Sequence, residues 1–361
     1  INFYVDLTTN KNKMKNLVAN RIKNARVLNC LSQQNVADEL GVSKQMVSKY
    51  ENGDAIPTSS KFLKLSKLFG LKMDYFFNSF QVELGEINFR KKSSFSLKKQ
   101  SSLKEQIKIN LENYIWLEDT LSIDYSFKNA IKNIKINKIV DVEKAVLKLR
   151  TDWKIGIDPI HNIIQLLEDK EIKVIELYDV DDKFDGLATY VNGKFPVIVV
   201  NGNFPVERKR FTLLHELGHL LLNLPDCDTK QEEQFCNKFA AEFLFPKEIV
   251  IREFGGKRNH ITLAELISTQ KKYGISIPAI VYRLVDSGIL SKQRHTDFYK
   301  RTRFNPSLNR EVNASRFETP EKSNRFEQLV YRALSQENIS ISKASSLLNK
   351  NIESVKESSL I

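Results

Sequence analysis

Residues 211–222 read Phe211-Thr212-Leu213-Leu214-His215-Glu216-Leu217-Gly218-His219-Leu220-Leu221-Leu222 and combine two histidines with a dense run of leucine. The apolar positions predict a buried helix. Histidines four residues apart lie on one face of a helix, about one turn from each other, so both imidazoles can bind one Zn²⁺. Glu216 lies beside them and can act as a general base toward a water molecule. The stretch therefore predicts a zinc centre with His215 and His219 as ligands.

A catalytic zinc centre needs a third protein ligand and an open fourth position. Leu222 and Pro225 stand where the metzincin pattern requires glycine and histidine, so that class is excluded. The next helical pattern supplies carboxylates instead. Glu233 and Asn237 share a face there, which suits a ligand and a side chain that orients an imidazole. Weaker ligand candidates are Glu232, Asp226, Asp228 and Cys227.

Three strand patterns precede the histidine helix, at residues 172–177, 187–191 and 195–201. Asn192-Gly193, between the last two, is a strong signal for a tight hairpin. The strands predict a small antiparallel sheet. The strand at 195–201 could offer an edge to an extended peptide, and an ordinary edge or core strand is the equally open alternative.

Helical patterns surround this sheet. Asp158 before Pro159 predicts the start of a helix that runs to Asp169. Pro246 and Thr262 lie near further helix starts. The order of helices, small sheet and helices predicts an α+β domain over residues 141–290.

The segment from Leu31 to Gly53 predicts two short helices around a turn at Gly41. In such a helix-turn-helix, the second helix enters the major groove of DNA. The side chains expected to face the bases are Ser43, Lys44, Gln45, Ser48 and Lys49. Gln33, at the start of the preceding helix, is expected to reach a phosphate or to brace Gln45.

The whole chain is expected to be multidomain and mainly α-helical. Its segments are an N-terminal extension (1–13), the all-α helix-turn-helix domain (14–80), a basic linker with a connecting helix (81–140), the α+β domain (141–290) and a helical C-terminal region (291–361). We expect the first helix to begin at Met14 and the last helices to lie near residues 326–335 and 342–348.

Composition limits the class of protein. The 361 residues are 41% hydrophobic and 28% charged, which is typical of a folded globular chain. Lys and Arg exceed Asp and Glu by 56 to 44, and the net charge of +12 favours a polyanionic partner such as nucleic acid. Three cysteines are too few for a disulfide framework, and no apolar run is long enough to span a bilayer. These features predict a cytoplasmic protein with no membrane partner.

Two parts of the sequence resemble known families. The segment from Leu17 to Phe77 resembles the XRE or λ-repressor-like DNA-binding domains, on the Ser43-Lys44-Gln45 start and the Tyr50-Glu51-Asn52-Gly53 end of its second helix. Residues 141–290 resemble the ImmA/IrrE family of zinc metallopeptidases, on the His-Glu-Leu-Gly-His motif at 215–219 and on the stretch from Glu233 to Pro246.

The second resemblance implies a zincin-like fold in which His215, His219 and Glu233 bind Zn²⁺ and Glu216 is the general base. It also implies a zinc-dependent endopeptidase that hydrolyses a peptide bond in a protein partner. By the same resemblance, the partner is a repressor or an antitoxin-like regulator, and the setting is a response to stress.

Two functions stay open on these grounds. One is a DNA-binding transcriptional regulator fused to a zinc endopeptidase. The other is a transcription factor or antitoxin whose zinc domain senses or binds a partner without significant turnover. Both use the same residues and both have double-stranded DNA as a partner. Because domains of this kind commonly bind paired half-sites as dimers, a homodimer is also expected.

Overall fold

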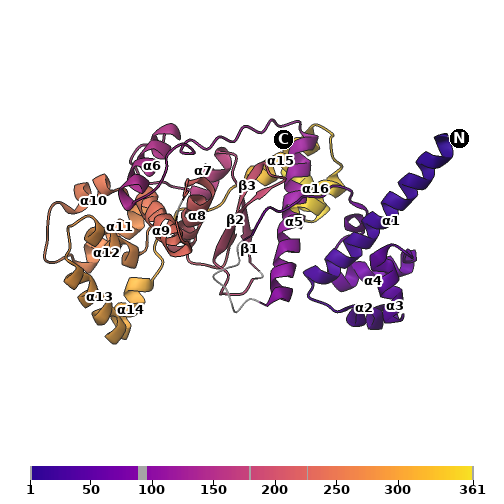
Figure 1. Ribbon diagram of the computed structural model, residues 1–361, viewed down its shortest axis with the longest axis horizontal. Helices are drawn as coiled ribbons and strands as arrows, with labels where there is room; N and C mark the ends of the chain where they lie inside the picture. The colour runs from indigo at the N-terminus through magenta and orange to yellow at the C-terminus, as the bar shows by residue number, and fades with distance from the viewer. Residues whose placement is uncertain (1, 88–95, 179, 226, 360–361) are drawn as a thin grey trace. The chain divides into compact units, whose positions relative to one another are not determined.

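The computed structural model describes residues 2–87, 96–178, 180–225 and 227–359, with side chains from Asn12 onward. The chain divides into two compact units. Unit one gathers the described parts of residues 1–84, 88–122 and 336–361, and unit two contains residues 85–87 and 123–335. Both units are mainly helical, as predicted, and unit two adds a small sheet (Figure 1).

Unit one is built from helices. They are α1 (Asn2–Leu28), α2 (Gln33–Leu40), α3 (Lys44–Asn52), α4 (Ser59–Phe69), the 3-10 helix η1 (Met73–Phe77), α5 (Leu97–Thr120), α16 (Ile341–Leu348) and α17 (Ile352–Ser359). The first helix begins at Asn2, so the expected start at Met14 was wrong. No glycine or proline interrupts the sequence between the two positions, and the helix therefore continues toward the N-terminus.

The first helices of unit one share an apolar core. Val18 and Ile22 of α1 pack with Val36 of α2, Val47 of α3 and Leu65 of α4, all buried. The turn between α2 and α3 has Gly41 in the left-handed conformation, with φ 64°, which a glycine adopts at little cost. The predicted helix-turn-helix is therefore present.

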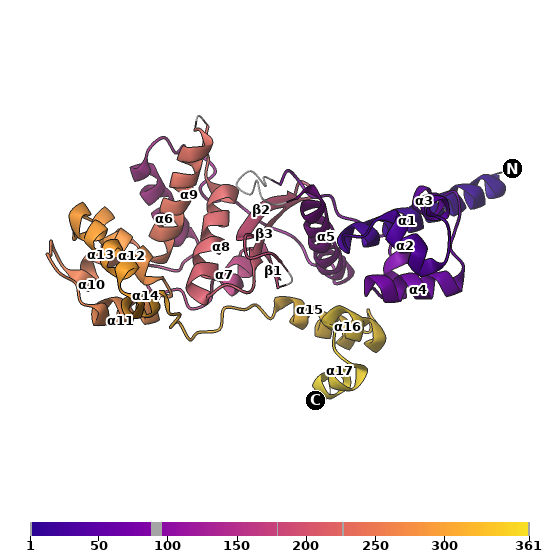
Figure 2. The same ribbon diagram turned by 90° about the horizontal axis from the view of Figure 1, so that it is seen from below.

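Unit two carries the predicted α+β arrangement. Its elements are α6 (Ile139–Asp152), α7 (Ile163–Asp169), β1 (Lys173–Leu177), β2 (Gly186–Val191), β3 (Phe195–Asn201), α8 (Val206–Leu221), α9 (Thr229–Leu244), α10 (Lys247–Phe254), α11 (Leu263–Tyr273), α12 (Ile277–Asp286), α13 (Lys292–Phe304), α14 (Pro306–Asn313) and α15 (Arg325–Ser335). In Figure 2, α8 lies between the sheet and α9, and α10 to α14 gather at one end of this unit.

The sheet is mixed, with strand order β1-β3-β2, and this corrects the expected antiparallel sheet. β3 pairs with β2 antiparallel, across the turn predicted at Asn192-Gly193, and with β1 parallel. Every residue of β3 is buried, which fits a central strand covered on both faces. Because β3 has partners on both sides, it offers no edge to a peptide, and that prediction was wrong; the strand beside α8 with an outer edge is β2.

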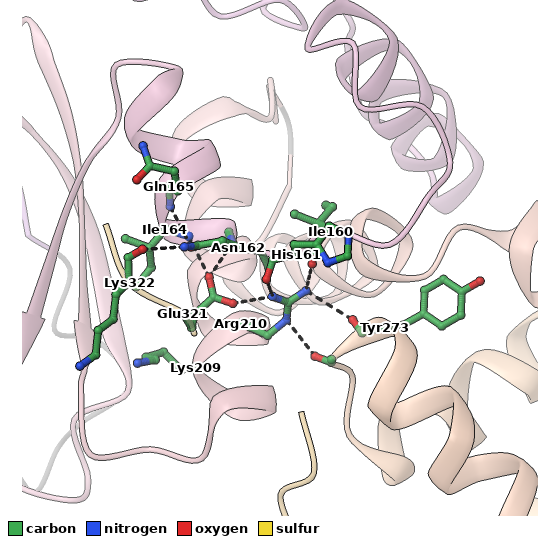
Figure 3. Close-up of polar contacts among 12 residues, drawn as sticks. Ile160, His161, Asn162, Ile164, Gln165, Lys209, Arg210, Tyr273, Glu321 and Lys322 are labelled. Atoms are coloured by element: carbon green, nitrogen blue, oxygen red, sulfur yellow. Dashed lines mark hydrogen bonds and ion pairs between the residues drawn. The ribbon is translucent and has the colours of Figure 1, made fainter. Parts of the chain in front are cut away.

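A buried ion pair ties the C-terminal part of unit two to α8. The C-terminal strap, residues 314–324, has no helix or strand and connects α14 to α15. Arg210 of α8 and Glu321 of the strap form an ion pair in which both side chains are at most 1% exposed. Glu321 also accepts hydrogen bonds from the backbone N–H groups of Ile163 and Ile164, at the start of α7 (Figure 3). The strap therefore belongs to the core of this unit.

Arg210 also sets where α7 begins. Its guanidinium donates to the carbonyl oxygens of Ile160 and His161 (Figure 3), which holds these residues outside the helix. The helix starts only after Asn162, whose side chain accepts from the backbone N–H of Gln165. The expected start at Asp158-Pro159 was therefore wrong.

Glu207 makes a second attachment one turn before Arg210. Its carboxylate accepts hydrogen bonds from the backbone N–H groups of Arg316 and Phe317 and from the Ser315 hydroxyl. Burial acts to raise the pKa of Glu207, but these hydrogen bonds outweigh it and lower the pKa below its usual value. The carboxylate is thus ionised at neutral pH and holds the strap against α8.

We predict that Glu321→Leu lowers the free energy of unfolding by about 3–5 kcal/mol, because it leaves Arg210 as an unpaired buried charge. The double change Arg210→Met with Glu321→Leu should recover most of this loss. Denaturant unfolding of the metal-free protein measures both. The control is Arg208→Met, which removes an ion pair to Asp185 with side chains 54% and 48% exposed, and should cost less than about 1 kcal/mol. Equal costs for Glu321→Leu and Arg208→Met would contradict the prediction.

Candidate functional site

The predicted histidine helix is α8, and its side chains divide into a buried face and a partly exposed face. Leu213, Leu214 and Leu217 are fully buried and fix the helix in the core of unit two. His215, Glu216 and His219 lie on the opposite, partly exposed face. The histidines are therefore not core residues; they face solvent-accessible space while the leucines hold the helix.

A close approach of α9 to α8 builds the other half of the site. A Cβ placed on Gly218 would lie 3.2 Å from both Cα and Sγ of Cys236, so glycine is what allows the two helices to come this near. Buried Phe239 and Ala240 continue the contact along α9. This packing brings the first turns of α9 next to the two histidines.

Potential ligand atoms of three side chains converge between the helices. The Nε2 atoms of His215 and His219 are 3.2 Å apart. The Glu233 carboxylate places one oxygen 3.3 Å from Nε2 of His215 and the other 3.5 Å from Nε2 of His219. The structure thus brings together the three side chains that the sequence nominated as metal ligands.

The spacing of these atoms fits a zinc ion. Zinc binds nitrogen and oxygen at about 2.0–2.2 Å, and tetrahedral geometry then separates two ligand atoms by about 3.3–3.5 Å. The 3.2 Å between the two nitrogens lies close to that separation, and each nitrogen has a different oxygen of the Glu233 carboxylate at 3.3 or 3.5 Å. Two imidazoles and one carboxylate are also the donor set of a catalytic zinc centre, which keeps its fourth position for water or substrate.

A hydrogen-bond partner at Nδ1 orients each imidazole. The Asn237 side-chain oxygen lies 3.0 Å from Nδ1 of His215, and the Glu232 carboxylate lies 2.9 Å from Nδ1 of His219. An acceptor at Nδ1 fixes the proton there and leaves the Nε2 lone pair for a metal. Asn237 therefore has the orienting position expected from the sequence, whereas Glu232, considered as a ligand, orients His219 instead.

Glu216 lies on α8 between the two histidines and faces the start of β2. A Cβ placed on Gly186 would lie 3.3 Å from Cγ of Glu216 and 2.8 Å from Cγ2 of Thr212. The first residue of β2 is therefore packed directly against the proposed general base. Sequence reasoning missed Gly186 because nothing local marks a glycine as the neighbour of a residue far along the chain.

The remaining ligand candidates have other places. Asp228 caps the N-terminus of α9 by accepting from the backbone N–H of Gln231. Asp226 lies outside the described residues. Among those described, one further group of three carboxylates comes together, Glu143, Glu242 and Asp286.

Lysine and arginine side chains already form ion pairs with that second group of carboxylates. Lys238 pairs with Glu143 and Asp286 at 2.6 and 2.7 Å, and fully buried Arg283 pairs with Glu242 at 2.7 Å. Burial acts to lower the pKa of Lys238, but its hydrogen bonds to Asp286 and Glu143 outweigh this and raise it. The group is therefore a buried ion-pair network.

The second candidate surface is on α3. Lys44, Gln45 and Lys49 are exposed and Ser48 is half-buried, and their spacing puts them on one face of the helix. The opposite face, with Val47, Tyr50 and Glu51, is buried against the other helices of unit one. Ser43 caps the helix by accepting from the backbone N–H of Met46 at 3.2 Å.

Gln33 does not brace Gln45, which was one of its two expected roles. Its side-chain amide donates to Glu51 at 2.8 Å, and Arg26 binds the same carboxylate at 2.6 and 3.0 Å. Gln33 therefore braces Glu51 rather than Gln45. These contacts attach the end of α3 to α1 and α2.

Comparisons with known proteins agree with both regions. Residues 22–76 match the helix-turn-helix family, and residues 167–285 match a peptidase family described as the IrrE N-terminal-like domain. The chain belongs to the helix-turn-helix family and carries an IrrE N-terminal-like domain. His215, His219 and Glu233, and the two helices that carry them, lie inside the matched IrrE-like segment.

Curated relatives match the helix-turn-helix part. The SPbeta prophage-derived HTH-type transcriptional regulator YonR of Bacillus subtilis is 38% identical over 69 residues, 19% of this chain and 64% of that protein. The HTH-type transcriptional regulator MJ0272 of Methanocaldococcus jannaschii is 36% identical over 58 residues, 16% of this chain and 88% of that protein. In the described parts of the chain, none of the helices combines the length and apolar character needed to cross a membrane.

We predict that Gly218→Ala weakens zinc binding by the IrrE-like domain. The new Cβ must push Cys236 away by a few tenths of an ångström, and Glu233 moves with it. Overpacking of this kind costs about 1–3 kcal/mol, against a gain of about 1 kcal/mol for alanine in a helix. Competition with a chelator measures the zinc affinity. Gly256→Ala is the control, because a Cβ there meets nothing within 4 Å; equal affinities in the two variants would refute the prediction.

Proposed function

We propose that this chain is a DNA-binding transcriptional regulator whose IrrE-like domain is a zinc-dependent endopeptidase acting on a protein partner. The observation that carries the proposal is the convergence of His215, His219 and Glu233, with Glu216 beside them on the same helix. A zinc site that only stabilises a fold is closed by four ligands and has no need of such a carboxylate.

The side chains divide the chemistry between them. Zn²⁺, when bound, supplies a Lewis acid that polarises the peptide carbonyl and acidifies water. His215, His219 and Glu233 hold the ion, and Asn237 and Glu232 keep the two imidazoles in the tautomer that binds it. Glu216 takes a proton from the attacking water and returns it to the departing amine nitrogen.

An extended substrate segment is proposed to pair with the outer edge of β2. Zincin-like folds and other sheet proteins bind peptides by adding them as a strand, because the backbone hydrogen bonds need no particular sequence. β2 is an outer strand of the sheet, and it starts at Gly186 beside Glu216. A peptide paired there would pass directly over the proposed general base.

The helix-turn-helix is proposed to bind double-stranded DNA through the exposed face of α3. Lys44 and Lys49 supply charge for phosphates, and Gln45 and Ser48 can hydrogen bond to base edges. The named relatives are transcriptional regulators, which supports this role. A repressor or antitoxin-like partner, a stress signal and a homodimer stay predictions.

We predict that Glu216→Gln keeps zinc and lowers the rate of partner cleavage by about 10²- to 10⁴-fold, since it removes the base and leaves the ligands. Comparing the proteins cleaved in cells that carry the wild type or the variant identifies the partner, and the metal content of both purified proteins is measured. Glu248→Gln, an exposed change on α10, is the control and should cleave normally.

The outcome separates the two functions left open by the sequence. Undiminished cleavage by zinc-loaded Glu216→Gln would remove Glu216 as the base. No cleavage of any partner by zinc-loaded wild type would favour a domain that senses or binds without turnover.

We predict that Lys44→Ala with Lys49→Ala weakens duplex binding and flattens its salt dependence. Each lost phosphate contact lowers the slope of log affinity against log salt by about 0.9, so two should lower it by about 2. Binding to a labelled operator fragment at several salt concentrations measures the slope. Lys257→Ala with Lys300→Ala removes the same charge from exposed sites in unit two, and an equal effect there would exclude α3 as the binding surface.

A further inference from the structure

The outer edge of β2 presents a row of backbone groups. Along an antiparallel strand, successive residues turn their N–H and C=O alternately to the two sides. The carbonyl of Tyr190 points outward, because it accepts a hydrogen bond from a segment other than β3. Ala188 and Gly186 therefore point their backbone groups the same way, and this row runs from the hairpin end of the strand to Glu216.

Residues 85 and 86 of the same chain already bond to the hairpin end of β2. The backbone N–H of Gly85 donates to the carbonyl of Tyr190 at 2.8 Å, and the Thr189 hydroxyl donates to the carbonyl of Glu86 at 3.3 Å. Residues 85–87 pack with unit two although the residues before them belong to unit one. We call residues 85–87 the cis strand.

Glycine is required for this contact. A Cβ placed on Gly85 would lie 2.9 Å from the Tyr190 carbonyl oxygen and 3.3 Å from the Thr189 hydroxyl oxygen. The first distance is shorter than real Cβ contacts allow, and the atom it meets is backbone, which cannot move aside cheaply. A side chain at residue 85 would therefore lift the cis strand from β2.

We propose that the cis strand is an internal competitor for the peptide-binding edge of β2. The inference rests on the proposed endopeptidase function and adds a form of regulation to it. A partner segment paired only with Gly186 and Ala188 fits beside the cis strand. A segment that pairs along all of β2 must displace it, because Gly85 occupies the carbonyl of Tyr190.

The same contact links the two activities of the chain. Gly85 follows directly after Leu84, the last residue of the first segment of the helix-turn-helix unit. The cis strand therefore lies where the chain passes from one unit to the other. Release of the cis strand lengthens the edge available to a partner.

The test uses the full chain with Gly85→Ala and a labelled synthetic peptide of residues 81–87. In the wild type, the tethered strand competes with the free peptide; in the variant it does not. One hydrogen bond is worth about 0.5–1.5 kcal/mol, so the peptide should bind the variant about two- to twelvefold more tightly. The backbone N–H of residue 85 should exchange with solvent faster by a similar factor. Gly256→Ala is the matched control and should equal the wild type.

A second variant covers the case in which Gly85→Ala disturbs folding, which thermal unfolding would reveal. Thr189→Val removes only the hydroxyl that holds Glu86, and it should move peptide affinity and exchange in the same direction by a smaller factor. Unchanged affinity and exchange in both variants would overturn the proposal.

Neither readout depends on turnover. If Glu216→Gln cleaved as well as the wild type, the endopeptidase proposal would fail while the cis strand could still be present. Once a cleaved partner is known, Gly85→Ala should lower KM and leave kcat unchanged, because it removes a competitor without touching the reacting groups.

Discussion

The close approach of α8 and α9 at Gly218 is the constraint on which the candidate metal centre depends. Two histidines on one helix provide two ligands and no more, so the third must come from a neighbour at the right distance. Gly218 has no side chain, and Cys236 fills the space where one would be. The first turns of α9 then place Glu233 against both Nε2 atoms and Glu232 and Asn237 against the two Nδ1 atoms. One missing Cβ thus sets the geometry of five polar side chains.

Much of the fold and of the site could be predicted from local sequence patterns. The i, i+4 spacing of His215 and His219 and the Asn192-Gly193 turn are properties of short stretches, and they were predicted from the sequence. The two helices around Gly41 are equally local. The fold class follows from such elements, because their order along the chain decides the architecture.

What the sequence could not provide are contacts between distant residues. The strand order β1-β3-β2 depends on pairings that no strand specifies alone. α7 starts later than the sequence predicts because Arg210, about 50 residues away, donates a hydrogen bond to the carbonyl of Ile160. Gln33 binds Glu51 rather than Gln45 for a similar reason, since Arg26 draws that carboxylate to the junction of three helices. In each case a partner remote in sequence outweighed the local preference.

The ion pair of Arg210 and Glu321 has a consequence for biosynthesis. The two residues are 111 positions apart, and Arg210 lies five residues before His215 on the same helix. The buried pair can form only once residue 321 has been synthesised, whereas the apolar core shared by α1 to α4 and η1 lies within residues 18–76.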